Sequence, residues 1–135
     1  MIAVDTNVVV RLLIEDDPDQ ARQARRVFAA EEVFVADTVV LETTWVLSYS
    51  YKLDSAAIVA GLRRLFGLPN VHLRDAAAVA LALEWHEGGL DFADAFHLAQ
   101  AAHCSRLVTF DRRFVARARD ISGPEVVLVG AQTIE

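Results

Sequence analysis

Short apolar runs and amphipathic segments alternate along the whole chain. Five apolar runs have the length of buried strands and occupy residues 1–4, 33–36, 71–73, 106–110 and 126–129. Segments with helical spacing of apolar residues, bounded by cap or turn residues, occupy residues 8–14, 18–30, 38–51, 55–66, 75–87, 91–102 and 114–119. Strands that alternate with helices predict an α/β sandwich with a mainly parallel sheet of about five strands. Because no repeat, linker or low-complexity tract interrupts this pattern, we expect one domain over residues 1–135.

The composition is that of a globular protein. The chain has 135 residues, of which 54% are hydrophobic and 24% charged, enough for a core without disulfides. No apolar run approaches the roughly 20 residues of a membrane span, and no basic, signal-like segment opens the sequence. The single cysteine, Cys104, is expected to be a small buried residue. These features favour a cytoplasmic protein without membrane association.

The charge balance limits how this protein can bind nucleic acid. A net charge of −6 argues against coating nucleic acid by bulk electrostatics. It leaves open an enzyme whose acidic site recruits divalent cations and acts on nucleic acid. Lys52 is the only lysine, and the remaining basic residues are arginines.

Two aspartates follow predicted strands directly. Asp5 comes after the first apolar run and Asp111 after the run that ends at Phe110. In an open parallel sheet, ligands bind in the crevice at the carboxyl ends of the strands, so both carboxylates are candidates for that crevice. The alternative is that each aspartate only caps the helix that follows it.

Glu42 lies within an apolar helical stripe. Its neighbours at helical spacing are Val39, Trp45 and Val46. An ionised carboxylate facing the core is costly unless a partner or a metal compensates it, so Glu42 is a candidate metal ligand. Alternatively, Glu42 sits at the edge of the stripe and pairs with an arginine.

Asp91 and Asp94 are three residues apart at the start of a predicted helix. This spacing suits a helix cap, which we assign to Asp91. Asp94 then lies in the first helical turn, where the helix dipole favours its ionised form. We therefore assign Asp94 to the site and keep Asp91 as a possible supporting residue.

Four carboxylates on one edge of a sheet predict a metal site. Asp5, Glu42, Asp94 and Asp111 would repel one another unless cations neutralised them. Oxygen ligands suit Mg²⁺ or Mn²⁺, which activates water and stabilises charge on a phosphodiester. The possible supporting residues are Thr6, Asn7 and Thr109, whose polar groups adjoin these acids.

Other side chains carry less specific signals. Arg112 and Arg113 suit phosphate binding or a solvated surface equally well. The four histidines and Cys104 show no zinc spacing. The aromatic residues are expected in the core, and these are Phe28, Trp45, Phe66, Phe96 and Phe110.

The chain resembles the PIN-domain family, and in size and order the toxin nucleases of prokaryotic VapBC-type toxin–antitoxin pairs. The resemblance rests on residues 4–8 (Val-Asp-Thr-Asn-Val), Glu42, Asp94-Ala95 with Leu98-Ala99, and residues 109–114 (Thr-Phe-Asp-Arg-Arg-Phe). It implies a three-layer α/β/α fold and a Mg²⁺- or Mn²⁺-dependent endoribonuclease with Asp5, Glu42, Asp94 and Asp111 at its centre. It also implies single-stranded regions of tRNA, rRNA or mRNA as substrate, a small cognate antitoxin protein, and a homodimer.

Three other interpretations remain. A haloacid-dehalogenase-like phosphatase also begins with a strand-end aspartate, but it requires a second aspartate where this chain has Asn7 and a lysine near the site. A receiver-type signalling domain requires that lysine as well. A PIN-like module that binds protein without catalysis would not need the four acids.

Overall fold

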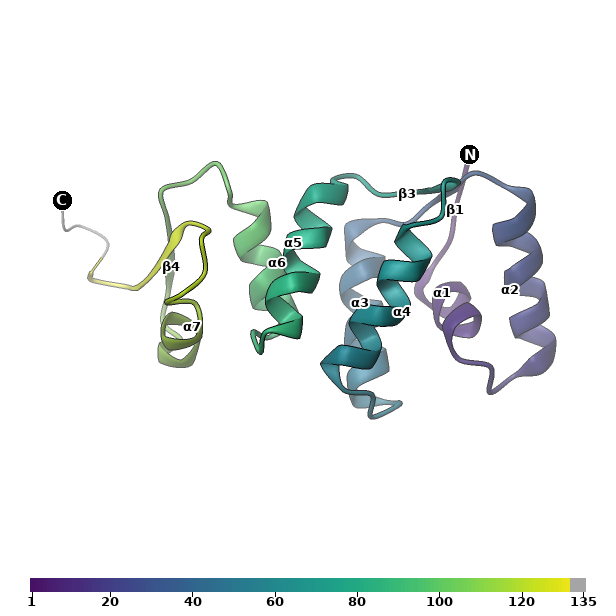
Figure 1. The fold of residues 1–135 in the computed structure, drawn as a ribbon, viewed down its shortest axis with the longest axis horizontal. Coiled ribbons are helices and arrows are strands. Elements are labelled where there is room, and N and C mark those ends of the chain that lie inside the picture. Colours follow the sequence, from purple (N-terminus) through teal and green to yellow (C-terminus); the bar gives the residue numbers. More distant parts are fainter. Residues whose placement is uncertain (132–135) are drawn as a thin grey trace. The chain divides into compact units, whose positions relative to one another are not determined.

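The computed structural model describes residues 1–131 and divides into two compact units. The first unit is Met1–Ala76, and the second begins at Ala77. Each unit contains its own parallel strands and its own helices. Figure 1 shows the elements of both units.

The first unit is built on a parallel sheet of three short strands. They are β1 (Ile2–Ala3), β2 (Val33–Phe34) and β3 (Val71–His72), in the order β1-β2-β3. Ile2 pairs with Val33, and Val33 pairs with Val71 on its other side. Four helices connect these strands, α1 (Thr6–Leu13), α2 (Pro18–Ala30), α3 (Asp37–Tyr49) and α4 (Ser55–Phe66).

Local sequence accounts for the beginnings of three of these helices. Asp5, Asp17 and Asp54 cap α1, α2 and α4 through side-chain oxygens that accept backbone N–H groups. Pro18 follows Asp17 at the first position of α2, where its missing N–H costs no hydrogen bond. Helix α3 begins at Asp37 without a side-chain cap, so the cap expected there is absent.

Buried β-branched and leucine side chains fill the centre of the first unit. Val33 and Val35 come from the β2 segment, Leu47 from α3, and Ile58 and Leu62 from α4. Each is almost completely removed from solvent, which provides the main free energy for this packing.

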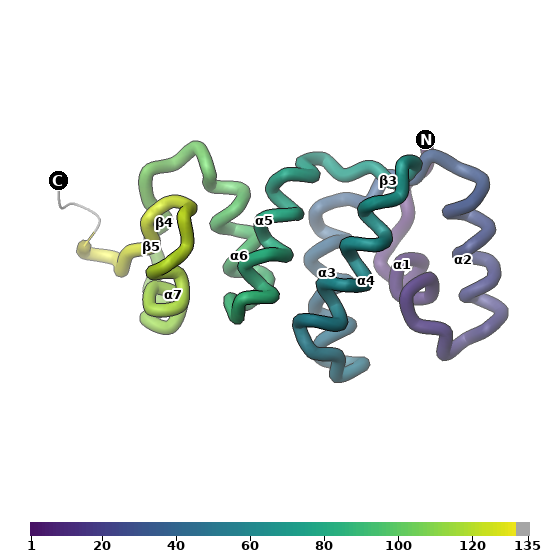
Figure 2. Tube along the Cα trace, viewed as in Figure 1, coloured from purple at the N-terminus to yellow at the C-terminus, as the bar shows by residue number. Residues whose placement is uncertain are grey.

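The second unit combines three helices with a two-stranded parallel sheet. Its elements are α5 (Ala76–Glu87), α6 (Phe92–Gln100), β4 (Arg106–Thr109), α7 (Arg112–Arg117) and β5 (Glu125–Leu128). Strands β4 and β5 pair in parallel along their full length, and α7 contacts both of them (Figure 2). Gly89, with φ of +115°, forms the turn between α5 and α6 in a conformation that favours glycine.

Some expectations about boundaries and burial are wrong. Helix α7 begins at Arg112, two residues before Phe114, because Asp111 already provides its cap. Trp45 is 58% exposed, since the buried face of α3 is formed by Val40, Thr43, Thr44 and Leu47. Phe110 lies just past the end of β4 and is 86% exposed. Cys104 is exposed in the turn before β4.

Among the residues that the structure describes, no helix is long and apolar enough to cross a membrane.

Candidate functional site

Asp5 stands between the first strand and the first helix. Its Oδ1 accepts a hydrogen bond from the N–H of Val8 at 3.2 Å, so its role as a helix cap is confirmed. The residue itself is exposed, while the preceding Val4 and the following Thr6 are buried. The carboxylate is thus held at a fixed place at the end of β1 by packing on both sides.

Thr6 links the beginning of α1 to α3. Its buried side-chain hydroxyl donates a hydrogen bond to Oε1 of Glu42, 36 residues further along the chain. Because Thr6 adjoins Asp5, this bond fixes Glu42 relative to the end of β1. Thr6, a possible supporting residue in the sequence, therefore contacts one of the predicted acids. Asn7 is exposed beside it.

Glu42 is found in neither of the two environments predicted for it, a core-facing position or a pair with an arginine. Glu42 is exposed, so it does not face the core of the first unit. Its described hydrogen bond comes from a threonine hydroxyl rather than from an arginine. A neutral donor of this kind orients a carboxylate without cancelling its charge.

Asp91 and Asp94 lie at the helix positions expected from their spacing. Oδ2 of Asp91 accepts the N–H of Asp94 at 3.2 Å, which confirms Asp91 as the cap of α6. Asp94 is partly buried in the first turn of that helix.

Asp94 is an electrostatically perturbed carboxyl group. Burial raises its pKa, and the negative charges of Asp91 and Asp111 raise it further. His97 acts in the opposite direction, so it lies near enough to influence Asp94. No role was expected for His97, although its place one helical turn after Asp94 in the sequence was a signal of this proximity.

Asp111 is fixed by the turn that joins β4 to α7. Its Oδ1 accepts the N–H groups of Arg113 and Phe114 at 2.9 and 3.2 Å, so the cap role is confirmed. Its own N–H donates to Oγ1 of Thr109 at 3.0 Å. Thr109 is therefore a positioning residue for Asp111.

The predicted site residues fall into two groups. Asp5, Thr6 and Glu42 are brought together in the first unit, and Asp91, Asp94 and Asp111 in the second. Within residues 1–131, neither unit alone gathers three or more His, Cys, Asp or Glu side chains in a metal-binding arrangement. The donors are nevertheless all oxygen atoms of hard ligands, which fit Mg²⁺ or Mn²⁺ by their chemistry.

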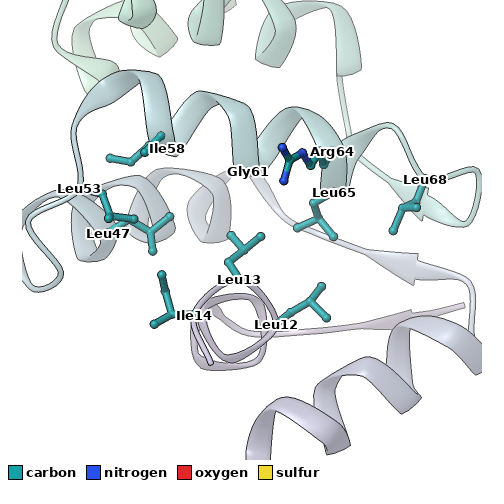
Figure 3. Close-up of a pocket in the computed structure, with 11 residues that line it drawn as sticks. Leu12, Leu13, Ile14, Leu47, Leu53, Ile58, Gly61, Arg64, Leu65 and Leu68 are labelled. Carbon is teal, nitrogen blue, oxygen red and sulfur yellow. The ribbon is translucent and has the colours of Figure 1, made fainter. Parts of the chain in front are cut away.

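A separate apolar groove of about 370 Å³ lies in the first unit between α1, α3 and α4. Leu13 points from α1 toward α4, and Leu47 and Ile58 lie beside it (Figure 3). Arg64 is the charged residue of the lining, and none of the predicted acids takes part. The groove is therefore suited to apolar contacts and not to acid-based chemistry.

Comparisons with known proteins matched a family model and solved structures. The family model described as "PIN domain" matches residues 2–120 of this chain. A crystal structure of VapC20 from Mycobacterium tuberculosis, described as a sarcin-ricin loop cleaving toxin, is 26% identical. The match covers 86% of this chain and 94% of that chain, with a TM-score of 0.42. A search of curated protein sequences found no match.

Proposed function

Because the chain belongs to the PIN-domain family, we propose that it is a Mg²⁺- or Mn²⁺-dependent endoribonuclease, the toxin of a toxin–antitoxin pair. The family is one of nucleases, which generally use divalent metal ions. The observation that carries the proposal is the family match over residues 2–120, which spans all four predicted acids. The proposed substrate of this ribonuclease is a single-stranded region of tRNA, rRNA or mRNA.

We propose that Asp5, Glu42, Asp94 and Asp111 bind the metal. The perturbed Asp94 supports this assignment, because a cation would relieve the repulsion that raises its pKa. When bound, a divalent ion lowers the pKa of water and stabilises charge developing on the phosphodiester.

Other residues of this chain hold the acids in place. Thr6 orients Glu42 through its hydroxyl, and Thr109 fixes the backbone of Asp111. Asp91 caps the helix that carries Asp94. Rigid positioning of this kind is required because small displacements of reacting groups reduce catalysis strongly.

The central experiment measures cleavage of single-stranded RNA by the purified, antitoxin-free protein. We expect cleavage with Mg²⁺ or Mn²⁺, no cleavage with chelator, and a loss of about 100-fold or more for Asp94→Asn. Asp120→Asn removes an exposed carboxylate of the same unit and serves as the matched control. Equal cleavage by Asp94→Asn and wild type would refute the assignment of Asp94.

We further propose that an apolar segment of the antitoxin occupies the groove between α1, α3 and α4, and that the toxin forms a homodimer. The leucine-rich lining supports the first part, because amphipathic helices bind in such grooves. A Cβ added at Gly61 meets only Leu13 Cδ2, at 3.8 Å, so a longer side chain there would fill the groove.

Gly61→Leu should therefore weaken antitoxin binding and leave RNA cleavage unchanged, while Gly61→Ala should affect both little. Calorimetry with the antitoxin encoded beside the toxin gene measures the first effect, and sedimentation measures the dimer. Unaltered antitoxin affinity in Gly61→Leu would exclude the groove as its site.

A further inference from the structure

Phe110 is a nearly fully exposed aromatic residue held in a rigid setting. It is 86% exposed, more than any other large hydrophobic residue in the described part of the chain. The backbone on both sides is fixed, because the N–H of Asp111 bonds to Thr109 Oγ1 and the Asp111 carboxylate caps α7. The ring is therefore displayed to solvent at a defined position, directly beside a proposed metal ligand.

Two exposed arginines follow this ring. Arg112 and Arg113 are exposed, and within residues 1–131 neither guanidinium forms an ion pair or a side-chain hydrogen bond. Four other arginines are paired with carboxylates, among them Arg22 with Asp19 and Arg25 with Glu15. Although the net charge of the chain is −6, two positive charges therefore lie next to the exposed ring.

An exposed aromatic ring beside free basic side chains is the combination that binds single-stranded nucleic acid. Bases stack on the ring without sequence preference, and the basic groups follow the backbone. Arginine suits this role because its planar guanidinium forms paired hydrogen bonds with phosphate.

We propose that Phe110 is a stacking platform for the base of a nucleotide next to the scissile phosphate, and that Arg112 and Arg113 bind neighbouring phosphates. This inference rests on the proposed ribonuclease function and assigns residues that hold the substrate. Phe110 and the two arginines are positioning residues, since the reacting atoms belong to the phosphodiester beside Asp111.

A second copy of the chain is a weaker explanation for the exposed ring. A stable protein interface buries about 800 Å² per partner, and one aromatic side chain supplies at most about a third of that area. The adjoining arginines would also be buried against an acidic chain at the cost of their hydration. A single-stranded RNA uses both the ring and the charges.

The test measures binding separately from cleavage. A fluorescently labelled 12-nucleotide RNA is titrated with antitoxin-free protein in chelator, and its anisotropy is followed. We expect Phe110→Leu to weaken binding about tenfold and Phe110→Tyr to retain the affinity of the wild type. Circular dichroism melting of each variant verifies that the fold is intact.

An oligonucleotide with abasic sites identifies stacking as the cause. The wild type should bind it about tenfold more weakly than the intact RNA, and Phe110→Leu should cause no further loss. In a plot of the logarithm of the binding constant against the logarithm of the salt concentration, Arg113→Gln should reduce the magnitude of the slope by about 0.7. Phe110→Leu should leave this slope unchanged.

Distinct results separate the two hypotheses. If the wild type cleaves RNA with Mg²⁺ but Phe110→Leu binds RNA as tightly as the wild type, the stacking inference is wrong and the ribonuclease proposal stands. If Phe110→Leu only dissociates a dimer in sedimentation, the ring belongs to an interface between copies, which also overturns the inference. If the wild type neither binds nor cleaves RNA, both proposals are wrong.

Discussion

At the scale of single residues, a threonine hydroxyl sets the position of a proposed catalytic carboxylate. Thr6 is buried and donates its hydroxyl hydrogen to Glu42 on another helix. A buried hydroxyl requires a hydrogen-bond partner, and an exposed glutamate requires a constraint if it is to hold a fixed orientation. One hydrogen bond satisfies both needs.

Thr6→Val preserves the shape of this side chain and removes the donor. We expect a decrease of about 1 kcal/mol in the free energy of unfolding, measured by urea denaturation, from the lost hydrogen bond. Mn²⁺ affinity, measured by calorimetry, should also fall because Glu42 loses its orienting partner. Thr6→Ser keeps the hydroxyl and should retain Mn²⁺ affinity. Unchanged stability and Mn²⁺ affinity in the valine variant would show that this bond has no role.

Asp94 combines a stability cost with a proposed function. Its pKa in the folded protein is raised, so the protonated form contributes stability at acidic pH that is lost as the pH rises through that pKa. At neutral pH the ionised carboxylate is therefore destabilising in metal-free protein. A cation bound beside it would reverse this effect.

Asp94→Asn should consequently raise the melting temperature in chelator at pH 7 and flatten its dependence on pH. Mn²⁺ at a hundred times the Kd of the wild type should raise the free energy of unfolding of the wild type by about 2.7 kcal/mol. The same Mn²⁺ concentration should stabilise Asp94→Asn far less. Differential scanning fluorimetry with and without Mn²⁺ provides the comparison, with Asp120→Asn as the control. An equal Mn²⁺ shift in the wild type and Asp94→Asn would place the ion elsewhere.

At the scale of elements, local capping explains how most of the described helices begin. Asp5, Asp54, Asp91 and Asp111 each accept backbone N–H groups of the helix that follows. These contacts span two or three residues, so sequence alone predicts them well. A capping oxygen does not exclude a second role, because a carboxylate has two oxygens and several acceptor positions.

Substitutions of Asp91 distinguish a capping role from a metal-binding role. Asp91→Ser retains a capping oxygen and should keep both stability and RNA cleavage near the values of the wild type. Asp91→Ala should lower the free energy of unfolding by about 1 kcal/mol through loss of the cap of α6. Chemical denaturation and cleavage assays distinguish these effects. A large loss of cleavage in a stable Asp91→Ser protein would make Asp91 a member of the metal site.

At the scale of the whole molecule, the family match confirms the predicted PIN-like α/β fold class. Parallel pairing of strands is confirmed within each unit. The haloacid-dehalogenase and receiver alternatives gain no support, since the match is to another family.

The proposal that distant acids serve the same metal predicts non-additive effects. Asp5→Asn and Asp111→Asn should each abolish most RNA cleavage, about 100-fold or more, and the double variant should be scarcely worse than either. Single-turnover cleavage rates at saturating Mn²⁺ provide the measurement. Multiplicative losses would indicate that the two carboxylates act independently.

The sequence by itself determined the order of strands and helices, the caps of α1, α6 and α7, and the candidate acids, because these depend on residues only a few positions apart. Contacts across the fold decided the rest. The Thr6–Glu42 bond joins residues 36 positions apart, and the charge of Asp111 reaches Asp94 from another element. Helical spacing placed Glu42 in a core-facing stripe, yet the buried face of α3 was set by what packs against it. Burial is a property of neighbouring elements in space, and for that reason only the tertiary structure revealed the exposed ring of Phe110.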